Sequence, residues 1–197
     1  MGTVGPCRQR AVFLDRDGVI NRNVLNPATG DFEAPLTAED FEFIPGAVSA
    51  MRELRAAGFL LFLVSNQPNV AKGKSTLEQL AAIHMKLQSG LTRSGIEFSR
   101  FYYCLHHPRG VVSEYSRSCE CRKPSPYFLL KAGAQFNLPL SQSWMVGDRP
   151  TDVECGRAAG TKTILIGSGP SSFAKDALAD EIAPDLLSAA RFILSAD

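Results

Sequence analysis

Short runs of apolar residues recur along the chain, separated by longer segments of mixed polarity. The runs are rich in β-branched and aromatic residues and are too short for typical helices, which favours buried β-strands. Polar residues or glycine follow most of the runs, as is typical of strand ends. The pattern predicts five strands, at residues 11–14, 59–64, 101–103, 143–146 and 163–166.

The segments between these runs carry signals for the start and the end of a helix. Pro45 and Gly46 open one segment, and Gly58 follows its end. Ser75 and Glu78 have the spacing of a capping box at the start of another segment. These signals predict helices at residues 45–57, 75–92, 126–136, 151–159 and 184–194.

Because strands and helices alternate, parallel strands joined by crossover helices are expected. We therefore expect a three-layer α/β fold with a parallel sheet, in a single domain that covers residues 1–197. Two stretches, 22–43 and 105–125, depart from the alternation and are expected to be long loops. Loops of this length in a compact domain usually have a function or a special tether.

Composition and charge exclude several classes of protein. The chain is 45% hydrophobic and 21% charged, with a net charge of +1, so it is neither disordered throughout nor strongly basic. No run approaches the roughly 20 apolar residues that cross a bilayer, and the N-terminus lacks an apolar signal segment. We expect a cytoplasmic, monomeric protein that binds neither nucleic acid nor membrane. A local cationic pocket that binds a small anion is still compatible with this net charge.

Carboxylates and a hydroxyl follow three of the predicted strands. Asp15 and Asp17 follow the first, Ser65 the second, and Asp148 with Asp152 the fourth. Ligands bind outside the carboxyl ends of strands in open parallel sheets, and oxygen-only ligands suit Mg²⁺. A Mg²⁺-bound carboxylate at that edge is suited to phosphoryl transfer, with cationic groups such as Arg122 and Lys123 to meet the charge. An isolated Asp-x-Asp-Gly is more often a plain turn, but the ordered combination is much less common by chance.

Four metal-ligand residues form two tight pairs in the second long loop. Cys104 and His106 are separated by twelve residues from Cys119 and Cys121. Three cysteines and one histidine make up a common structural zinc site, and the zinc would staple a loop at about residues 104–123 that has no core of its own. The alternative is a set of reduced thiols. An odd number of cysteines, five in all, argues against a disulfide framework.

The ordered set of motifs resembles the haloacid dehalogenase superfamily over roughly residues 10–167. Residues 13–21 (Phe-Leu-Asp-Arg-Asp-Gly-Val-Ile-Asn) are similar to its first motif, and residues 65–67 (Ser-Asn-Gln) to its second. Lys123 stands in the third motif, and Asp148 with Asp152 in the fourth. The resemblance implies a Rossmannoid sheet and phosphatase chemistry.

The resemblance also implies a role for each matching residue. Asp15 would be the nucleophile that forms an aspartyl-phosphate, and Asp17 would be the general acid and base. Asp15, the backbone carbonyl of Asp17 and Asp148 would hold Mg²⁺. Ser65 and Lys123 would bind the transferring phosphoryl group.

The Cys/His pairs narrow the resemblance to the branch that includes D-glycero-D-manno-heptose 1,7-bisphosphate 7-phosphatase and histidinol-phosphatase. This branch lacks a large cap domain, so short loops would form the pocket for a small sugar phosphate, with the 7-phosphate of the heptose bisphosphate as the expected target. The residues expected to bind the substrate are Asn23, Asn26, Asn66, Gln67, Arg122 and Arg149. The chain departs from the branch at Pro68-Asn69 and at residues 27–31, which border this pocket.

Other functions remain as alternatives. Histidinol phosphate or another small sugar phosphate could be the substrate. A phosphatase for nucleic-acid ends is disfavoured because the chain has no basic stripe. A zinc-stapled binding module without catalysis is also disfavoured, since all four motifs are intact.

Overall fold

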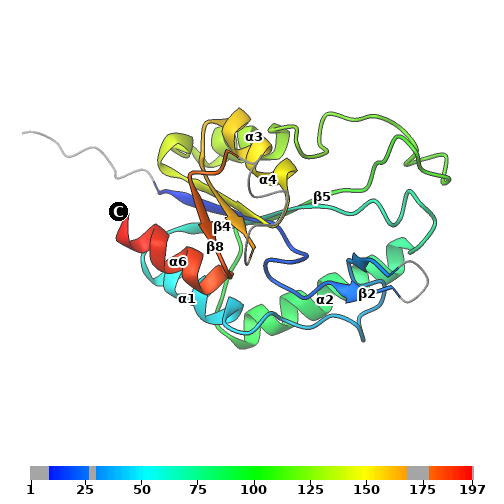
Figure 1. Ribbon diagram of the computed structural model, residues 1–197, viewed down its shortest axis with the longest axis horizontal. Helices are drawn as coiled ribbons and strands as arrows, with labels where there is room; N and C mark the ends of the chain where they lie inside the picture. Colours follow the sequence, from blue (N-terminus) through cyan, green and yellow to red (C-terminus); the bar gives the residue numbers. More distant parts are fainter. Residues whose placement is uncertain (1–8, 27–29, 168–177, 197) are drawn as a thin grey trace, which may run out of the picture.

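The computed structural model describes residues 9–26, 30–167 and 178–196. Its centre is a parallel six-stranded sheet with the strand order β5-β4-β1-β6-β7-β8 (Figure 1). The strands are β1 (Ala11–Leu14), β4 (Leu60–Asn66), β5 (Arg100–Cys104), β6 (Trp144–Gly147), β7 (Lys162–Ile166) and β8 (Glu181–Ala183). The five predicted strands are confirmed, and β8 is an addition at the edge.

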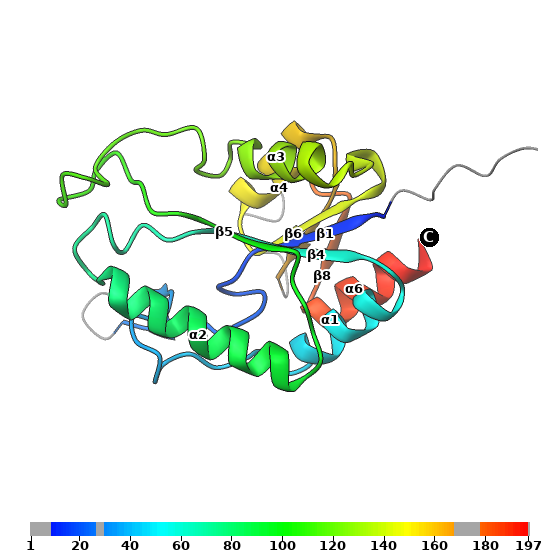
Figure 2. The ribbon, with the colours of Figure 1, turned by 180° about the vertical axis from the view of Figure 1, so that it is seen from behind.

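Helices cover both faces of the sheet, so the predicted three layers are confirmed. One face carries α1 (Ala47–Ala56), α2 (Leu77–Arg93) and α6 (Leu186–Ser195), as seen from both sides (Figures 1 and 2). The other face carries α3 (Tyr127–Phe136) and α4 (Pro150–Ala159), with a short 3₁₀ turn, η1 (Leu140–Gln142), between them in the chain. In the described residues, no helix is long and apolar enough to cross a membrane.

Alternation along the strands divides the core into two halves. In β1, Val12 and Leu14 pack into the cluster beneath α1, α2 and α6, whereas Ala11 and Phe13 pack beneath α3 and α4. All four side chains are fully buried. The sheet is therefore buried on both faces. Polar side chains are found at the carboxyl ends of its strands.

The predicted capping box is displaced by one residue. Thr76 Oγ1 accepts a hydrogen bond from the backbone N–H of Gln79, and the Thr76 N–H donates to Gln79 Oε1. The prediction used Ser75 and Glu78, which have the same spacing, but the helix begins at Leu77. Ser75 with Glu78 and Thr76 with Gln79 both have the spacing of a capping box, so the sequence alone does not tell which pair caps the helix. Only the packing of the folded chain distinguishes them.

The first long loop, between β1 and α1, contains a small hairpin of β2 (Val24–Leu25) and β3 (Phe32–Glu33). Two-residue strands have no readable period, so the sequence did not reveal it. The loop closes at its base, where the Arg22 N–H donates to the Glu42 carbonyl at 2.9 Å. Residues 27–29, in the unusual segment 27–31, lie outside the described part of the chain. The described residues contain no cap domain beyond this hairpin.

Candidate active site

The strand order brings the acidic motifs together. β1 lies between β4 and β6, and Asp15, Ser65 and Asp148 are found where these three strands end. The Asp15 N–H continues the sheet by donating to the Val146 carbonyl at 2.9 Å. Residues more than 130 positions apart in the sequence thus meet at one edge of the sheet.

A cluster of carboxylates occupies this edge. One oxygen from each of Asp15, Asp148 and Asp152 lies within 4.8 Å of the others. Burial raises the pKa of Asp15 to about 6 against the opposing effect of Lys123, and burial together with the charge of Asp15 raises the pKa of Asp148 to about 7. Burial thus disfavours the charged form of both carboxylates, and a cation bound beside them would favour it.

The cluster has the donor atoms that a hard divalent cation requires. Asp148 Oδ1 is buried and accepts no hydrogen bond, and its ion pair with Arg149 Nε is long, at 3.9 Å. An orphaned carboxylate oxygen beside other carboxylates fits Mg²⁺, which binds through oxygen ligands. Asp15, Asp148 and Asp152 could therefore hold such an ion.

Lys123 supplies the positive charge within the cluster. Its Nζ lies 2.8 Å from Asp15 Oδ1, 2.6 Å from Asp152 Oδ1 and 2.7 Å from the Val64 carbonyl. Burial alone would lower the pKa of this amine, but the charges of Asp15 and Asp152 more than offset burial and raise it. A fixed ammonium beside Asp15 can neutralise the oxygens of a phosphoryl group at that carboxylate.

Asn66 holds the backbone of Lys123. Its Nδ2 donates to the Lys123 carbonyl, and its Oδ1 accepts from the Lys123 N–H, both at 3.1 Å. The side chain was expected to contact substrate. The structure instead commits both ends of its amide to the loop that carries Lys123, although the residue also lines the cavity described below.

Asp17 is surrounded by hydrogen-bond donors. Arg16 donates from Nε to Oδ1 at 3.0 Å and from Nη2 to Oδ2 at 3.1 Å. Asn21 Nδ2 donates to Oδ1 at 3.0 Å, and Gln67 Nε2 donates to Oδ2 at 2.7 Å. Gln67 Nε2 also lies 2.9 Å from the buried Ser65 Oγ. The network fixes the carboxylate, and it includes Arg16 and Asn21, which the sequence analysis did not single out.

Two glycines permit the close approach of the motifs. Gly18 has a φ of 82°, and a Cβ there would collide with the Asp148 carboxylate. A Cβ at Gly147 would collide with the side chain of Asp152. The carboxylates can lie this close because neither backbone position carries a side chain.

The Cys/His cluster has the geometry of a closed metal site. Cys104, His106, Cys119 and Cys121 each bring a ligand atom to within 4.8 Å of the others. Cys119 Sγ lies 3.5 Å from the other two sulfurs, and Cys121 Sγ lies 3.6 Å from His106 Nδ1. Tetrahedral Zn–S bonds of about 2.3 Å would place sulfurs about 3.8 Å apart. The four residues therefore fit a zinc ion.

The metal-ligand cluster is close to the active-site edge in the chain, since Cys121 precedes Lys123 by two residues. The same loop is fastened to the loop after β4, because the N–H groups of Val111 and Val112 donate to the Ala71 carbonyl at 2.7 and 3.0 Å. The loop is thus held at its tip, and a metal ion at the Cys/His cluster would hold it a second time.

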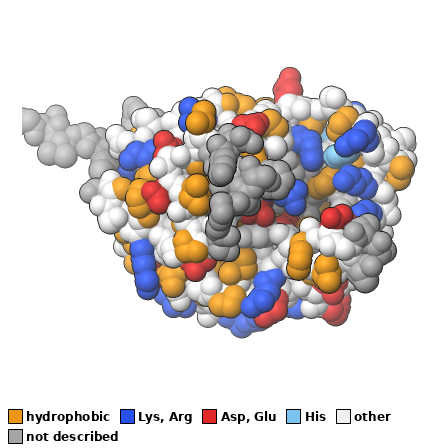
Figure 3. All heavy atoms as spheres, viewed as in Figure 1, with side chains coloured by type: hydrophobic (Ala, Val, Ile, Leu, Met, Phe, Trp, Pro, Cys, Tyr) orange, Lys and Arg blue, Asp and Glu red, His pale blue; other side chains and the backbone are white. Residues whose placement is uncertain are grey.

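A cavity of about 720 Å³ opens over the carboxylates. Figure 3 shows acidic side chains in this hollow and Lys and Arg side chains around a histidine beside it. Of the expected substrate-binding residues, Asn23, Asn66, Arg122 and Arg149 line the cavity, whereas Asn26 donates a hydrogen bond to Glu33 at 3.2 Å. Asp31, Pro68 and Asn69 line the cavity, as expected of the two segments said to border the pocket. Phe32, Glu33 and Ala34 of the hairpin also form part of its wall, and the sequence analysis missed them.

Comparisons with known proteins agree with this geometry. A family model described as HAD-hydrolase-like matches residues 120–190. The D-glycero-beta-D-manno-heptose-1,7-bisphosphate 7-phosphatase of Yersinia pestis is 38% identical over 172 residues, which are 86% of this chain and 87% of that protein. The protein of the same name in Vibrio cholerae is 36% identical and covers 93% of this chain and 96% of its own length.

A solved structure is also similar over nearly the whole chain. The D,D-heptose 1,7-bisphosphate phosphatase from B. bronchiseptica, solved with magnesium and phosphate, aligns with a TM-score of 0.81 and 26% identity. The alignment covers 96% of this chain and 100% of that one. With these relatives, this fold and the four motifs at one sheet edge, the chain belongs to the haloacid dehalogenase-like hydrolase family, alongside the heptose bisphosphate phosphatases.

Proposed function

We propose that the protein removes the 7-phosphate of D-glycero-D-manno-heptose 1,7-bisphosphate through an aspartyl-phosphate on Asp15. The observation that carries the proposal is the buried Asp15 carboxylate, which is paired with Lys123 and open to the cavity. The names of the relatives support the substrate, since they are phosphatases of this bisphosphate.

In the first half of the reaction, a carboxylate oxygen of Asp15 attacks phosphorus, and the bond from phosphorus to the sugar oxygen breaks. Asp17 gives its proton to the leaving oxygen. In the second half, Asp17 takes a proton from water, and the hydroxide attacks the aspartyl-phosphate to release phosphate and restore Asp15. The four donor groups around Asp17, from Arg16, Asn21 and Gln67, hold its carboxyl group in a fixed position for both halves.

Two metal ions fit the proposal. Asp15, Asp148 and the backbone carbonyl of Asp17 would hold Mg²⁺, which supplies positive charge for the phosphate oxygens when bound. Lys123 and Ser65 would also bind the phosphate oxygens. Asp152, whose Oδ1 lies 2.6 Å from Lys123 Nζ, would stand beside the ion and orient the lysine. Zinc at the four-residue Cys/His cluster would fix the loop that presents Lys123.

The residues expected to bind a sugar bisphosphate differ in the contact that they can make with it. Asn23 Oδ1 is buried without a hydrogen-bond partner, so a sugar hydroxyl could donate to it. Arg122 and Arg149 offer positive charge for the second phosphate. Asn66 and Gln67 would act indirectly, by positioning Lys123 and Asp17.

A comparison of substrates tests the proposed function. The protein would be assayed with Mg²⁺ for phosphate release from both anomers of heptose 1,7-bisphosphate and from histidinol phosphate. We expect the heptose substrate to have the higher kcat/KM. A strong preference for histidinol phosphate would overturn the choice of substrate, and failure to hydrolyse any ester would favour the binding module.

The role of Asn66 gives a separate prediction. Asn66→Ala removes two hydrogen bonds to the Lys123 backbone, each worth about 1 kcal/mol, so kcat/KM should fall by roughly tenfold or more. The control is Asn69→Ala, which changes a cavity residue on the neighbouring loop. Steady-state kinetics of both variants would decide, and an Asn66 variant as active as the control would contradict this role.

A further inference from the structure

The β2–β3 hairpin forms a wall of the cavity, although it pairs with no strand of the six-stranded sheet. Residues 31–34 line the cavity from the hairpin, and Asn69, Lys72 and Lys74 line it from the loop after β4. A two-stranded hairpin alone is at best marginally stable in water. Its place at the cavity must therefore be fixed by contacts with another part of the chain.

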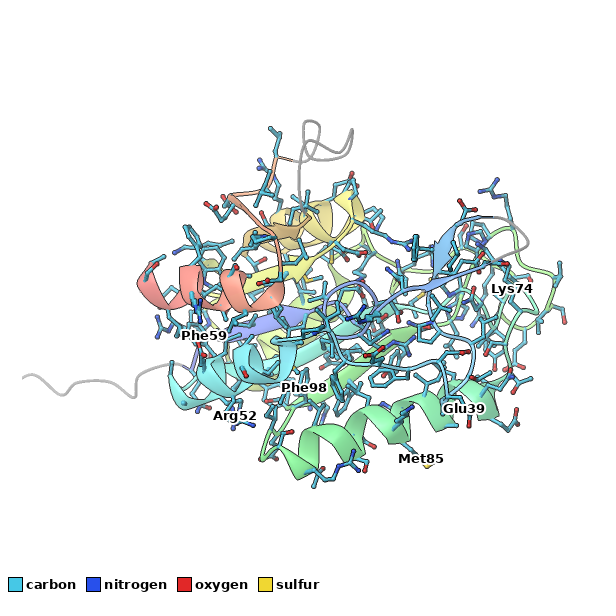
Figure 4. The ribbon with its side chains drawn as sticks, turned by 60° about the horizontal axis from the view of Figure 1, so that its bottom comes forward. Glu39, Arg52, Phe59, Lys74, Met85 and Phe98 are labelled. Carbon is cyan, nitrogen blue, oxygen red and sulfur yellow. The ribbon has the colours of Figure 1, made fainter. Side chains whose placement is uncertain are left out.

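An ion pair supplies such a contact. Lys74 Nζ donates to both carboxylate oxygens of Glu33, at 2.8 and 2.9 Å, and joins residues 41 positions apart. Asn26 Nδ2 donates to the same carboxylate, and these bonds lower the pKa of Glu33, with Lys74 the main cause. The Lys74 N–H donates to the Asn69 carbonyl at 2.9 Å, which anchors the lysine to its own loop. Figure 4 shows Lys74 beside the hairpin.

The wall has a mixed chemical character. Phe32 is 66% exposed, and Asp31 and Glu33 bring carboxylates to the same edge of the cavity. Because the Glu33 carboxylate is paired with Lys74, the wall offers an exposed apolar ring and carboxylate oxygens that can accept hydrogen bonds from hydroxyl groups. Lys72, Lys74 and Arg122 line the same cavity and can attract the anionic groups of an ester. The reacting phosphate must lie at Asp15, so the carbon skeleton of the ester is the part that can meet the hairpin.

We propose that Glu33 and Lys74 are positioning residues whose ion pair holds the hairpin at the cavity, where it selects phosphate esters of compact, hydroxyl-rich carbon skeletons. The inference rests on the phosphatase function proposed above and adds the element that selects the ester. Neither side chain takes part in phosphoryl transfer, so loss of the pair changes KM and not kcat. Exposed ion pairs of this kind correspond to changes of about two- to fivefold.

Charge reversal tests the proposal. Glu33→Lys and Lys74→Glu would be made singly and together, and kcat and KM measured with heptose 1,7-bisphosphate and with p-nitrophenyl phosphate. Each single reversal should raise KM for the heptose ester about two- to fivefold, with kcat within about twofold. The planar aryl ester, which does not use the wall, should be hydrolysed at least as well as before. The double reversal restores the pair and should return KM to its original value.

A matched control uses another exposed ion pair of the same loop. Arg22 Nε and Glu42 lie 3.8 Å apart at the base of the loop, and neither residue lines the cavity, so Arg22→Glu should leave KM unchanged. A double reversal with KM as high as in the single variants would show that Lys74 acts on the substrate directly, and would overturn the proposal. Single reversals without effect on KM would also overturn it. A complete lack of hydrolysis by the unaltered protein would instead contradict the proposed function.

Discussion

Replacing Asp15 with asparagine should reduce kcat for phosphate release by at least about 10³-fold, because an amide cannot form the aspartyl-phosphate. Substrate affinity should change much less, since Lys123 and the cavity walls remain. Asparagine has nearly the same shape as aspartate and keeps an oxygen for the 2.8 Å contact with Lys123. The variant should therefore fold, and circular dichroism and thermal melting would confirm this before rates are compared.

The control for this substitution is Asp40→Asn, which makes the same chemical change at an exposed position. Its kcat should match that of the unaltered protein. Substantial turnover by the Asp15 variant, with a folded control beside it, would eliminate Asp15 as the nucleophile. A different residue at the same sheet edge would then have to carry the phosphoryl group.

Removing one ligand of the proposed zinc site is expected to abolish metal binding there and to disable the site. Cys121→Ser should lower bound zinc from about one ion per chain to nearly none, because a closed site needs all four ligands. The melting temperature should fall by roughly 10 °C or more, since metal binding stabilises the folded loop. The rate should fall as well, because Cys121 and Lys123 share one short segment.

Cys155→Ala is a matched control for the metal prediction. Cys155 is a buried free thiol on α4 whose Sγ lies 3.2 Å from the Ser125 carbonyl, and it belongs to neither metal-ligand group. This variant should keep its zinc even if it melts at a lower temperature. Elemental analysis of both purified proteins gives the answer, and a Cys121 variant that retains a full zinc ion would contradict the proposed ligand set.

The sequence predicted those parts of the molecule that depend on regular patterns. The β1 run is apolar at every position, and the structure buries it on both faces. β2, β3 and β8 have only two or three residues, which is too few for a pattern to stand out. Strand order then determined the site, because three separate motifs converge only when β1 lies between β4 and β6.

Side-chain partners inside the site could not be read from the sequence. The motif containing Asn66 identifies the edge of the sheet but does not show that its amide turns toward the backbone of Lys123. Arg16 stands between two aspartates, yet the structure buries it completely and gives it two further neighbours, Gln67 after β4 and Tyr103 of β5. Such details depend on the tertiary arrangement, which local spacing does not encode.

The closed base of the first loop has a consequence for protein engineering. The Arg22–Glu42 backbone hydrogen bond brings the two ends of the hairpin segment together, while Asp15, Lys123 and Asp148 lie on other parts of the chain. The described residues between positions 23 and 40 thus lie in a segment whose two ends are held together. Hairpins of other lengths and sequences could be grafted there to create phosphatases for new esters, with the chemical machinery left untouched.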